Sequence, residues 1–298
     1  MTPRTYSLVT PARDEAANLR RLADCVLEQT VLPEAWVIVD DGSVDGTRGF
    51  AERLAERCPW IRVLSSPGAV THDGPLDRGR SVGRDIVAFK AGLAELRAPT
   101  DIVLKLDADV SVDADFFERL LGAFAEDSRL GITSGTCYEL EDGEWKPRFV
   151  TAGHARGATR AYRWTCLQEV SPLEERLGWD GIDELKAASL GWKTTSQPHL
   201  PFQHHRALGK RDGATGAWVG MGRASYFIGY RPLYLAARAI FKARHDPAAL
   251  AMLLGYLDAW VRRDPRCKDP GVRATLRELQ SIRRFGRRFR EATGQTLS

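Results

Sequence analysis

The chain has 298 residues, of which 43% are apolar and 28% charged, with a formal net charge of +4. This composition is typical of a globular protein and excludes wholesale disorder, and the 27 Gly and 15 Pro show no collagen-like period. No apolar run is long enough to cross a bilayer and the N-terminal residues have no apolar segment, so neither a transmembrane helix nor a secretory signal is expected.

The predicted elements alternate between apolar strands and amphipathic helices in the first part of the chain. Strands are predicted at residues 5–10, 35–39, 61–64, 102–106 and 130–133. Helices are predicted at residues 14–29, from 45 onward, after the polar loop 66–80, and at 113–126. We expect Pro11 to end the first strand, Asp14 to cap the first helix and Asp45 to open the second. This alternation predicts an α/β fold with a mostly parallel sheet flanked by helices.

Charge divides the chain into two parts. Residues 1–205 carry 24 Lys and Arg against 32 Asp and Glu, whereas residues 206–298 carry 19 against 7. The second part is predicted to be helical at residues 219–244, 247–263 and 270–291. We therefore expect a basic helical C-terminal extension over 206–298 whose partner is anionic, such as lipid headgroups, a phosphate-bearing substrate or nucleic acid. The alternative is a solvated helical surface.

The five cysteines are odd in number and widely spaced, and no C-x-x-C motif occurs. This pattern favours a reducing cytoplasm and predicts neither a disulfide framework nor a structural zinc site.

Three polar clusters follow predicted strands, at residues 10–15, 40–43 and 107–109. Ligands of parallel α/β sheets bind outside the carboxyl ends of the strands. Asp107 and Asp109 present hard oxygens that suit Mg²⁺ or Mn²⁺, which would bridge diphosphate oxygens, although Asp also caps ordinary turns. Asp40 and its neighbours can accept hydrogen bonds from ribose hydroxyls or a base N–H, or form a plain turn.

The segments LVTPARDEAANL, VIVDDGSVDGT and DIVLKLDADV together strongly resemble family 2 glycosyltransferases of the GT-A fold, over roughly residues 4–205. The resemblance implies a GT-A catalytic domain at 1–205, with a nucleotide-sugar half at about 1–110 and an acceptor half at about 111–205. It implies metal-dependent transfer of a hexose with inversion. It assigns the metal and diphosphate to Asp107 and Asp109, and the donor nucleotide to Pro11, Arg13, Glu15, Asp40, Asp41, Ser43, Arg84 and Asp107.

The resemblance also implies an Asp base at the start of an acceptor-side helix, but the E-D dipeptide of the family is missing here. Spacing from Gly191-Trp192 selects Asp180, whereas matching the dipeptide to Asp183-Glu184 selects Asp183. We favour Asp183, because like-charge repulsion from Glu184 would raise its pKa. The alternative is a pair of capping residues that opens an ordinary helix.

Two further features bear on the same site. His204 and His205 can add imidazole ligands to the metal, and Arg206 can stabilise the leaving diphosphate, or the His pair lies in a surface loop. The segment 226–241 interleaves aromatic residues with Arg, which fits a helix lying on an anionic membrane or one packed on the catalytic domain. We expect a cytoplasmic protein with peripheral attachment to the inner face of the cell membrane.

The predicted function is therefore transfer of a sugar from a nucleotide-diphosphate sugar, with UDP favoured, to a sugar, lipid-linked or other hydroxyl acceptor. Cell wall or polysaccharide biosynthesis is the expected setting. A nucleotidyltransferase acting on a sugar phosphate is the alternative, but it would show a Gly-rich basic loop after the first strand, and residues 10–15 contain no Gly. A nucleic-acid-binding protein is a third reading. The acidic body and the lack of nucleic-acid motifs count against it, so no nucleic-acid partner is expected.

Overall fold

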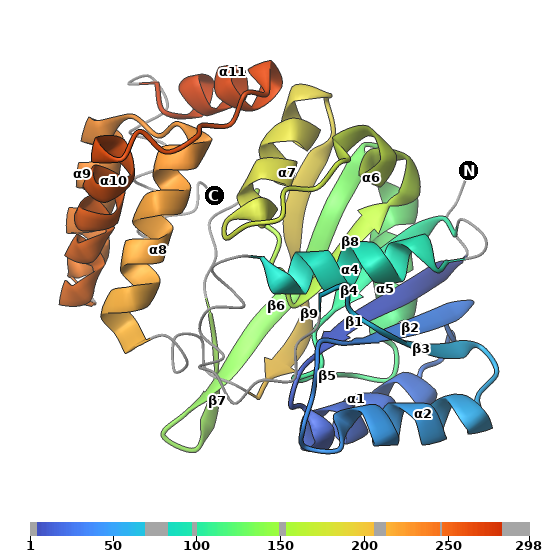
Figure 1. Ribbon diagram of the computed structural model, residues 1–298. Coiled ribbons are helices and arrows are strands. Elements are labelled where there is room, and N and C mark those ends of the chain that lie inside the picture. Colours follow the sequence, from blue (N-terminus) through green and yellow to red (C-terminus); the bar gives the residue numbers. More distant parts are fainter. Residues whose placement is uncertain are drawn as a thin grey trace.

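The computed structural model describes residues 5–68, 83–96, 100–148, 153–205, 213–244 and 246–281. One sheet with helices on both faces forms the body of the molecule, and a group of helices from the C-terminal third stands beside it (Figure 1).

The strands of the sheet are arranged in the order β3-β2-β1-β4-β8-β6-β9-β5, and β7 pairs only with β6. The strands β3, β2, β1 and β4 are mutually parallel, as are β6 and β9, whereas β8 runs antiparallel to β4 and β6. Their bounds are β1 Tyr6–Ala12, β2 Ala35–Asp40, β3 Ile61–Ser65, β4 Ile102–Leu106, β5 Val110–Val112, β6 Leu130–Glu141, β7 Glu144–Pro147, β8 Thr159–Arg163 and β9 Lys193–His204.

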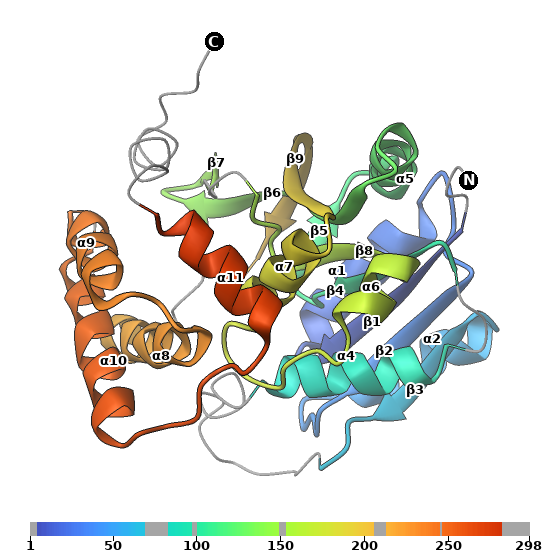
Figure 2. The same cartoon turned by 90° about the horizontal axis from the view of Figure 1, so that it is seen from above.

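Alternation along the central strands produces two apolar cores, one on each face of the sheet. Leu8 and Ile38 pack with α1, α2 and α5, whereas their neighbours Val9 and Val37 pack with α4, α6 and α7. Figure 2 shows these helices on the two faces. The body helices are α1 Ala16–Leu27, α2 Thr47–Arg57, α4 Arg84–Ala94, α5 Phe116–Glu126, α6 Trp164–Val170 and α7 Trp179–Ser189. The predicted α/β fold with helices on both sides of the sheet is confirmed.

Two local predictions in the first turn of the fold are wrong. Pro11 does not end β1 but pairs with Val39 of β2. It is tolerated because the pairing of β1 with β4 stops at Val9, so the missing N–H of Pro11 has no strand partner on that side. Asp14 does not cap α1. It has a left-handed backbone (φ 54°), and its carboxylate accepts a hydrogen bond from the Val44 N–H, 2.8 Å away.

The hydrophobic pattern of the sequence predicts little of the sheet beyond β4. The strands β5, β7 and β8 were not predicted, and the predicted strand 130–133 is only the start of β6. The Pro-containing stretch 197–202 is part of the longer β9. The two parallel strands β6 and β9 shift register twice along their length, which breaks the even alternation that sequence patterns rely on.

The predicted C-terminal helices are confirmed in type but not in extent. The helices are α8 Gly213–Ile228, α9 Pro232–Ala243, α10 Ala251–Val261 and α11 Pro270–Leu279, with a 3₁₀ turn, η1, at Pro247–Leu250. Predicted helix 219–244 is broken between α8 and α9, where Gly229 has a positive φ and Pro232 starts the next helix. The predicted final turns beyond residue 281 lie outside the described residues.

Close packing joins the C-terminal helices to one another and to the body. The helices α8 and α10 cross at Gly222 and Gly255, where an added Cβ on Gly255 would lie 2.0 Å from the Val219 carbonyl oxygen. The helix α11 packs on α7 through Val272 and Leu276. The domain boundary at residue 205 stays a prediction. None of the described helices is both long enough and apolar enough to cross a membrane.

Candidate active site

The carboxyl ends of β1 and β2 are tied together by hydrogen bonds. The Asp41 N–H donates to the Ala12 carbonyl at 2.9 Å, and the Asp14 N–H donates to the Ser43 hydroxyl at 3.0 Å. The Ser43 N–H in turn donates to the Asp40 carboxylate at 3.2 Å. Because these segments follow adjacent parallel strands, the first two polar clusters form one surface at this edge of the sheet.

Two further residues of the first cluster, Arg13 and Glu15, lie beside this surface. Glu15 is buried and its carboxylate accepts a hydrogen bond from the Asn18 side chain at 2.7 Å, while its N–H donates to Thr47 at 2.8 Å. Arg13 is partly exposed, and its Nε lies 3.9 Å from an Asp14 carboxylate oxygen. Glu15 therefore positions the turn between β1 and α1, and Arg13 lies half-buried in the same turn.

Arg84 connects the helix α4 to the end of β2. Its guanidinium group forms a bidentate ion pair with the Asp41 carboxylate, with Nε 3.2 Å from Oδ2 and an Nη closer still to Oδ1. A further Nη donates to the Pro67 carbonyl at 3.0 Å. Gly83 lets the chain enter α4 here, because its φ is +70° and an added Cβ would lie 2.4 Å from the backbone nitrogen of Arg176.

A buried lysine connects α4 to the end of β4. Lys105 is almost fully buried, and its ammonium group pairs with Asp107 and lies 3.5 Å from the Asp85 carboxylate. Trp179 at the start of α7 donates to Asp85 at 3.3 Å and places its ring 5.7 Å from the ammonium. Adjacent residues of α4, Arg84 and Asp85, therefore reach the strand ends of β2 and β4. Sequence reasoning missed Lys105 and Asp85. The signal was a charged residue inside an otherwise apolar strand.

The D-x-D segment spans the turn between β4 and β5. The Asp107 side chain is partly exposed, while Asp109 is nearly buried. Both offer carboxylate oxygens, which fit Mn²⁺ or Mg²⁺ in ligand chemistry.

The two histidines near this turn have different surroundings. His204 Nε2 lies 3.3 Å from Asp109 Oδ1. Burial alone would lower the pKa of His204, but a hydrogen bond and the charge of Asp109, together with a hydrogen bond to Cys137, raise it to about 10. His205 instead contacts the Ser111 hydroxyl at 2.6 Å, and burial and Arg21 lower its pKa. The structure therefore brings His204, and not the His205 ring, to the D-x-D carboxylate. Arg206 lies outside the described residues.

Asp183, the favoured base, lies inside the protein. Its side chain is only 2% exposed, one oxygen accepts from Arg160 at 2.6 Å, and the other accepts from the Tyr162 hydroxyl. Burial raises the pKa of Asp183 to about 7, with Glu184 adding to the shift and Arg160 opposing it. The expected contribution of Glu184 is present, but burial is the larger cause. Among the described residues, these contacts enclose the carboxylate, so they would have to open for it to meet an acceptor hydroxyl.

Glu184 and Arg160 complete this interior network. Arg160 is fully buried on β8, and its guanidinium donates to Glu184 at 3.0 Å and to the Asp180 carbonyl at 2.9 Å. Glu184 also accepts from the Ala155 N–H at 2.9 Å. These bonds fix the start of α7 against the sheet.

Asp180 is the acidic residue in the first turn of α7. Its side chain is half-buried and contacts only its own neighbour, the Gly181 N–H, at 2.9 Å among the contacts that the described residues show. Trp179 precedes it and links the same turn to Asp85. Position and partial exposure therefore favour Asp180 over Asp183 as the group that meets an acceptor.

Part of the chain is similar to a known protein family and to one of its characterised relatives. Residues 7–79, which contain the first two strand-end clusters, match the family model described as glycosyl transferase family 2. The succinoglycan biosynthesis protein ExoA of Rhizobium meliloti (strain 1021) is 30% identical over 122 residues, which are 41% of this chain and 33% of that protein. The match therefore spans about one third of the length of this relative.

Solved structures resemble the fold of this chain. The mannosyltransferase PcManGT from Pyrobaculum calidifontis, in complex with GDP-Man and Mn²⁺, has a TM-score of 0.58 at 16% identity, covering 98% of this chain and 85% of that one. The structure of GalNAc-T7 with UDP, GalNAc and Mn²⁺ has a TM-score of 0.56 at 16% identity, covering 76% of this chain and 48% of that one. The resemblance to family 2 glycosyltransferases and the GT-A-like fold are confirmed.

Proposed function

We propose that the protein transfers a sugar from a nucleotide-diphosphate sugar to an acceptor hydroxyl. The observation that carries this proposal is the joined edge of the sheet at β1, β2 and β4. There, Asp40 accepts a hydrogen bond from the Ser43 N–H, Asp41 pairs with Arg84, and Asp107 pairs with Lys105. Carboxylates accept hydrogen bonds from ribose and base, and a divalent cation with nearby basic groups suits a diphosphate. This combination fits a nucleotide sugar better than it fits either the nucleotide or the sugar alone.

Asp107 and Asp109 are the residues that would hold the divalent cation, either Mn²⁺ or Mg²⁺. Both follow β4, and their oxygens are hard ligands. A bound cation would offset negative charge on the leaving diphosphate, a contribution commonly worth several kcal/mol. Two structural neighbours, one in complex with GDP-Man and Mn²⁺ and one with UDP, GalNAc and Mn²⁺, support a divalent cation as the cofactor.

For the chemical step we favour Asp180 as the base in a single displacement with inversion. Its carboxylate would accept the proton of the acceptor hydroxyl as the oxygen attacks the anomeric carbon. Asp183 then has a positioning role, because its bonds to Arg160 and Tyr162 hold the first turn of α7 in place. The acceptor is proposed to be a saccharide in polysaccharide biosynthesis, in line with the named role of the relative in succinoglycan biosynthesis.

A panel of ligands tests the proposal directly. Thermal unfolding is measured with Mn²⁺ and UDP- or GDP-sugars, with sugar phosphates plus nucleoside triphosphates, and with oligonucleotides. Ligand at 100 times its Kd adds about 2.7 kcal/mol to the free energy of unfolding, so the correct donor raises Tm clearly. Stabilisation by sugar phosphate and triphosphate alone would favour a nucleotidyltransferase, and a rise only with oligonucleotides would refute sugar transfer.

We also propose that the C-terminal helices rest on an anionic membrane surface. The specific observation is an apolar stripe on α10 and the preceding turn, with spacing that keeps its members on one helix face. Its exposed members are Leu250, Leu253, Leu254, Leu257, Trp260 and Val261. Exposed basic residues follow at the end of the helix, including Arg263 and Lys268. An apolar face bordered by an aromatic residue and cations is typical of an interfacial helix. Peripheral attachment at the inner face of the cell membrane would bring a lipid-linked acceptor close to the enzyme.

Vesicle co-sedimentation tests the membrane proposal. Binding to vesicles that contain phosphatidylserine is expected at low salt and should weaken at high salt, because each basic residue near the surface contributes about 1 kcal/mol before screening. Leu254→Gln should reduce binding, while Leu32→Gln, at a comparably exposed apolar site on the body (50% against 65%), should not. Equal loss of binding in both variants, or no binding by the wild type, would contradict the proposal.

A further inference from the structure

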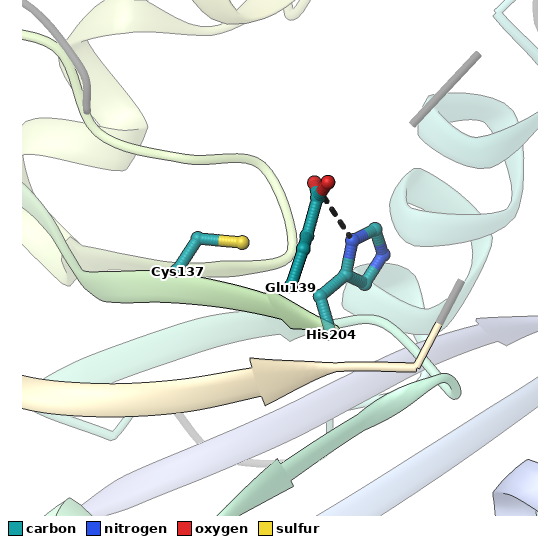
Figure 3. A group of neighbouring side chains, drawn as sticks. All are labelled: Cys137, Glu139 and His204. Carbon is teal, nitrogen blue, oxygen red and sulfur yellow. Dashed lines mark ion pairs between the residues drawn. The ribbon is translucent and has the colours of Figure 1, made fainter. Parts of the chain in front are cut away.

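Three metal-ligating side chains meet on one face of the sheet, where β6 lies beside β9 (Figure 3). Cys137 and Glu139 are two residues apart on β6 and therefore point to the same face. His204 is the direct neighbour of Glu139 in the parallel pairing of β6 with β9. One sulfur, one carboxylate oxygen and one ring nitrogen of this group lie within 4.8 Å of one another.

All three side chains are removed from solvent, and two of their polar atoms, which form a long ion pair with each other, have no hydrogen-bond partner among the described residues. Cys137, Glu139 and His204 are 2%, 3% and 8% exposed. Within the described part of the chain, neither Glu139 Oε1 nor His204 Nδ1 has a hydrogen-bond partner, although the two atoms are only 3.8 Å apart. A buried polar atom without a partner costs about 1–3 kcal/mol, so both atoms are candidates to bind something that is not part of the chain.

The far sides of the same two groups are already held in place. Arg148 Nε donates to Glu139 Oε2 at 2.8 Å, which leaves Oε1 facing the cluster. His204 Nε2 lies 3.3 Å from Asp109 Oδ1, which leaves Nδ1 facing the cluster. A histidine that binds a metal through one nitrogen commonly donates its other N–H to a carboxylate, and Asp109 occupies that place here.

We propose that Cys137, Glu139 and His204 form a zinc site, separate from the hard-cation site on Asp107 and Asp109. A thiolate, an imidazole and a carboxylate are a ligand set that suits Zn²⁺, and water would complete the coordination. On binding zinc, His204 would release its Nδ1 proton and Cys137 its thiol proton to solvent, while the Nε2–H of His204 donates to Asp109. The zinc site therefore orients one of the two carboxylates proposed to bind the diphosphate metal. This inference goes beyond sugar transfer, since zinc binding can be measured without any donor.

No sequence motif indicates this site, because its ligands are not close together in the chain. There is no C-x-x-C motif, and His204 reaches Cys137 and Glu139 only through the pairing of β6 with β9. The expectation that the chain has no structural zinc site rested on the spacing of its cysteines alone.

Cobalt substitution tests the proposal. Full-length protein is stripped with a chelator and titrated with Co²⁺, whose bond to a thiolate gives an intense near-ultraviolet charge-transfer band. One equivalent of Co²⁺ should produce the band in wild type, and Zn²⁺ should displace it. The band should be absent in Cys137→Ser and retained in Cys267→Ser, a matched variant at another buried cysteine. It should also be retained in Asp107→Asn, because this site does not use Asp107.

The wild-type measurement is decisive even if a variant fails to fold. No thiolate band at one equivalent of Co²⁺ in stripped, folded wild type would overturn the proposal, as would a band that is lost in Cys267→Ser and kept in Cys137→Ser. Glu139→Gln provides a second variant and should weaken Zn²⁺ binding at least tenfold, as measured by competition with a chromophoric chelator. Unchanged zinc affinity in that variant would also contradict the site. Failure of sugar transfer would leave all these readouts unaffected.

Discussion

Replacing Asp183 with Asn separates a buried structural carboxylate from a catalytic base. The change keeps the shape of the side chain but removes the charge opposite Arg160, which is 0% exposed and lies 2.6 Å from it. Breaking one side of a buried ion pair costs about 3–5 kcal/mol. We expect the lower end, about 3 kcal/mol, because Glu184 stays 3.0 Å from the same guanidinium.

The expected loss can be measured as a shift in Tm. With an unfolding entropy of about 2.1 cal/mol/K per residue, a loss of 3 kcal/mol lowers Tm by about 5 °C in a chain of 298 residues. Thermal unfolding followed by circular dichroism measures this shift. Asp180→Asn is the matched control. Its half-buried side chain makes no ion pair among the described residues, so Tm should change by less than about 1 °C.

The loss of kcat should be larger in Asp180→Asn than in Asp183→Asn, whereas the loss of Tm should be larger in Asp183→Asn. Asp180→Asn should lower kcat by about 10²–10⁴-fold and leave donor binding nearly unchanged, as expected for loss of a general base. Asp183→Asn should keep a larger share of kcat at a temperature where it is folded. If Asp183→Asn is as stable as wild type but loses kcat, while Asp180→Asn is active, the positioning role of Asp183 is refuted and it is the base.

Three further predictions follow from other parts of the molecule. Chelation by EDTA should abolish transfer and added Mn²⁺ or Mg²⁺ should restore it; full activity in EDTA would rule out the hard-cation site. Gly255→Ala should destabilise the protein by about 1–3 kcal/mol in urea unfolding, because the new Cβ would lie 2.0 Å from the Val219 carbonyl oxygen; wild-type stability would show that α8 and α10 pack less closely. The free energy of unfolding should fall as pH rises above about 6.5, and this fall should be smaller in Glu184→Gln. An unchanged pH dependence of stability in that variant would contradict the link between His154 and Glu184.

The sign of the pH effect follows from His154. Burial alone would lower the pKa of His154, but the hydrogen bond and the charge of Glu184 raise it above the ordinary value of 6.5. The folded state therefore binds the proton more tightly than the unfolded chain does. This contribution to stability is complete below about pH 6.5 and is lost as pH rises through the pKa of the folded state.

The parallel half of the sheet could be predicted because its strands follow a simple rule. Residues such as Val37 and Val39 are buried on one face and Trp36 and Ile38 on the other, so these strands appear as short continuous apolar runs followed by polar turns. The polar clusters at the strand ends could be located for the same reason.

The acceptor half could not be predicted in the same way because its core contains charge. Strand β8 buries Arg160 completely, and its counter-charge Asp183 comes from α7, so neither segment shows an apolar pattern. The sequence pattern offers both Asp183 and Asp180 as candidates for the base and favours Asp183. Only the contacts of Arg160 and Tyr162 show that one of them is enclosed. The pairing of Glu139 with His204 is equally invisible in the sequence, since it depends on the register of β6 with β9.

The most direct test of the central claim is release of nucleoside diphosphate from the donor that stabilises the protein, measured with Mn²⁺ and a saccharide acceptor. Wild type should release the diphosphate in step with transfer of the sugar. Asp107→Asn and Asp109→Asn should lose this activity by at least about 10²-fold, since each removes a ligand of the proposed cation. Wild-type rates of release in both variants, each shown to be folded, would contradict a donor site at the carboxyl end of β4.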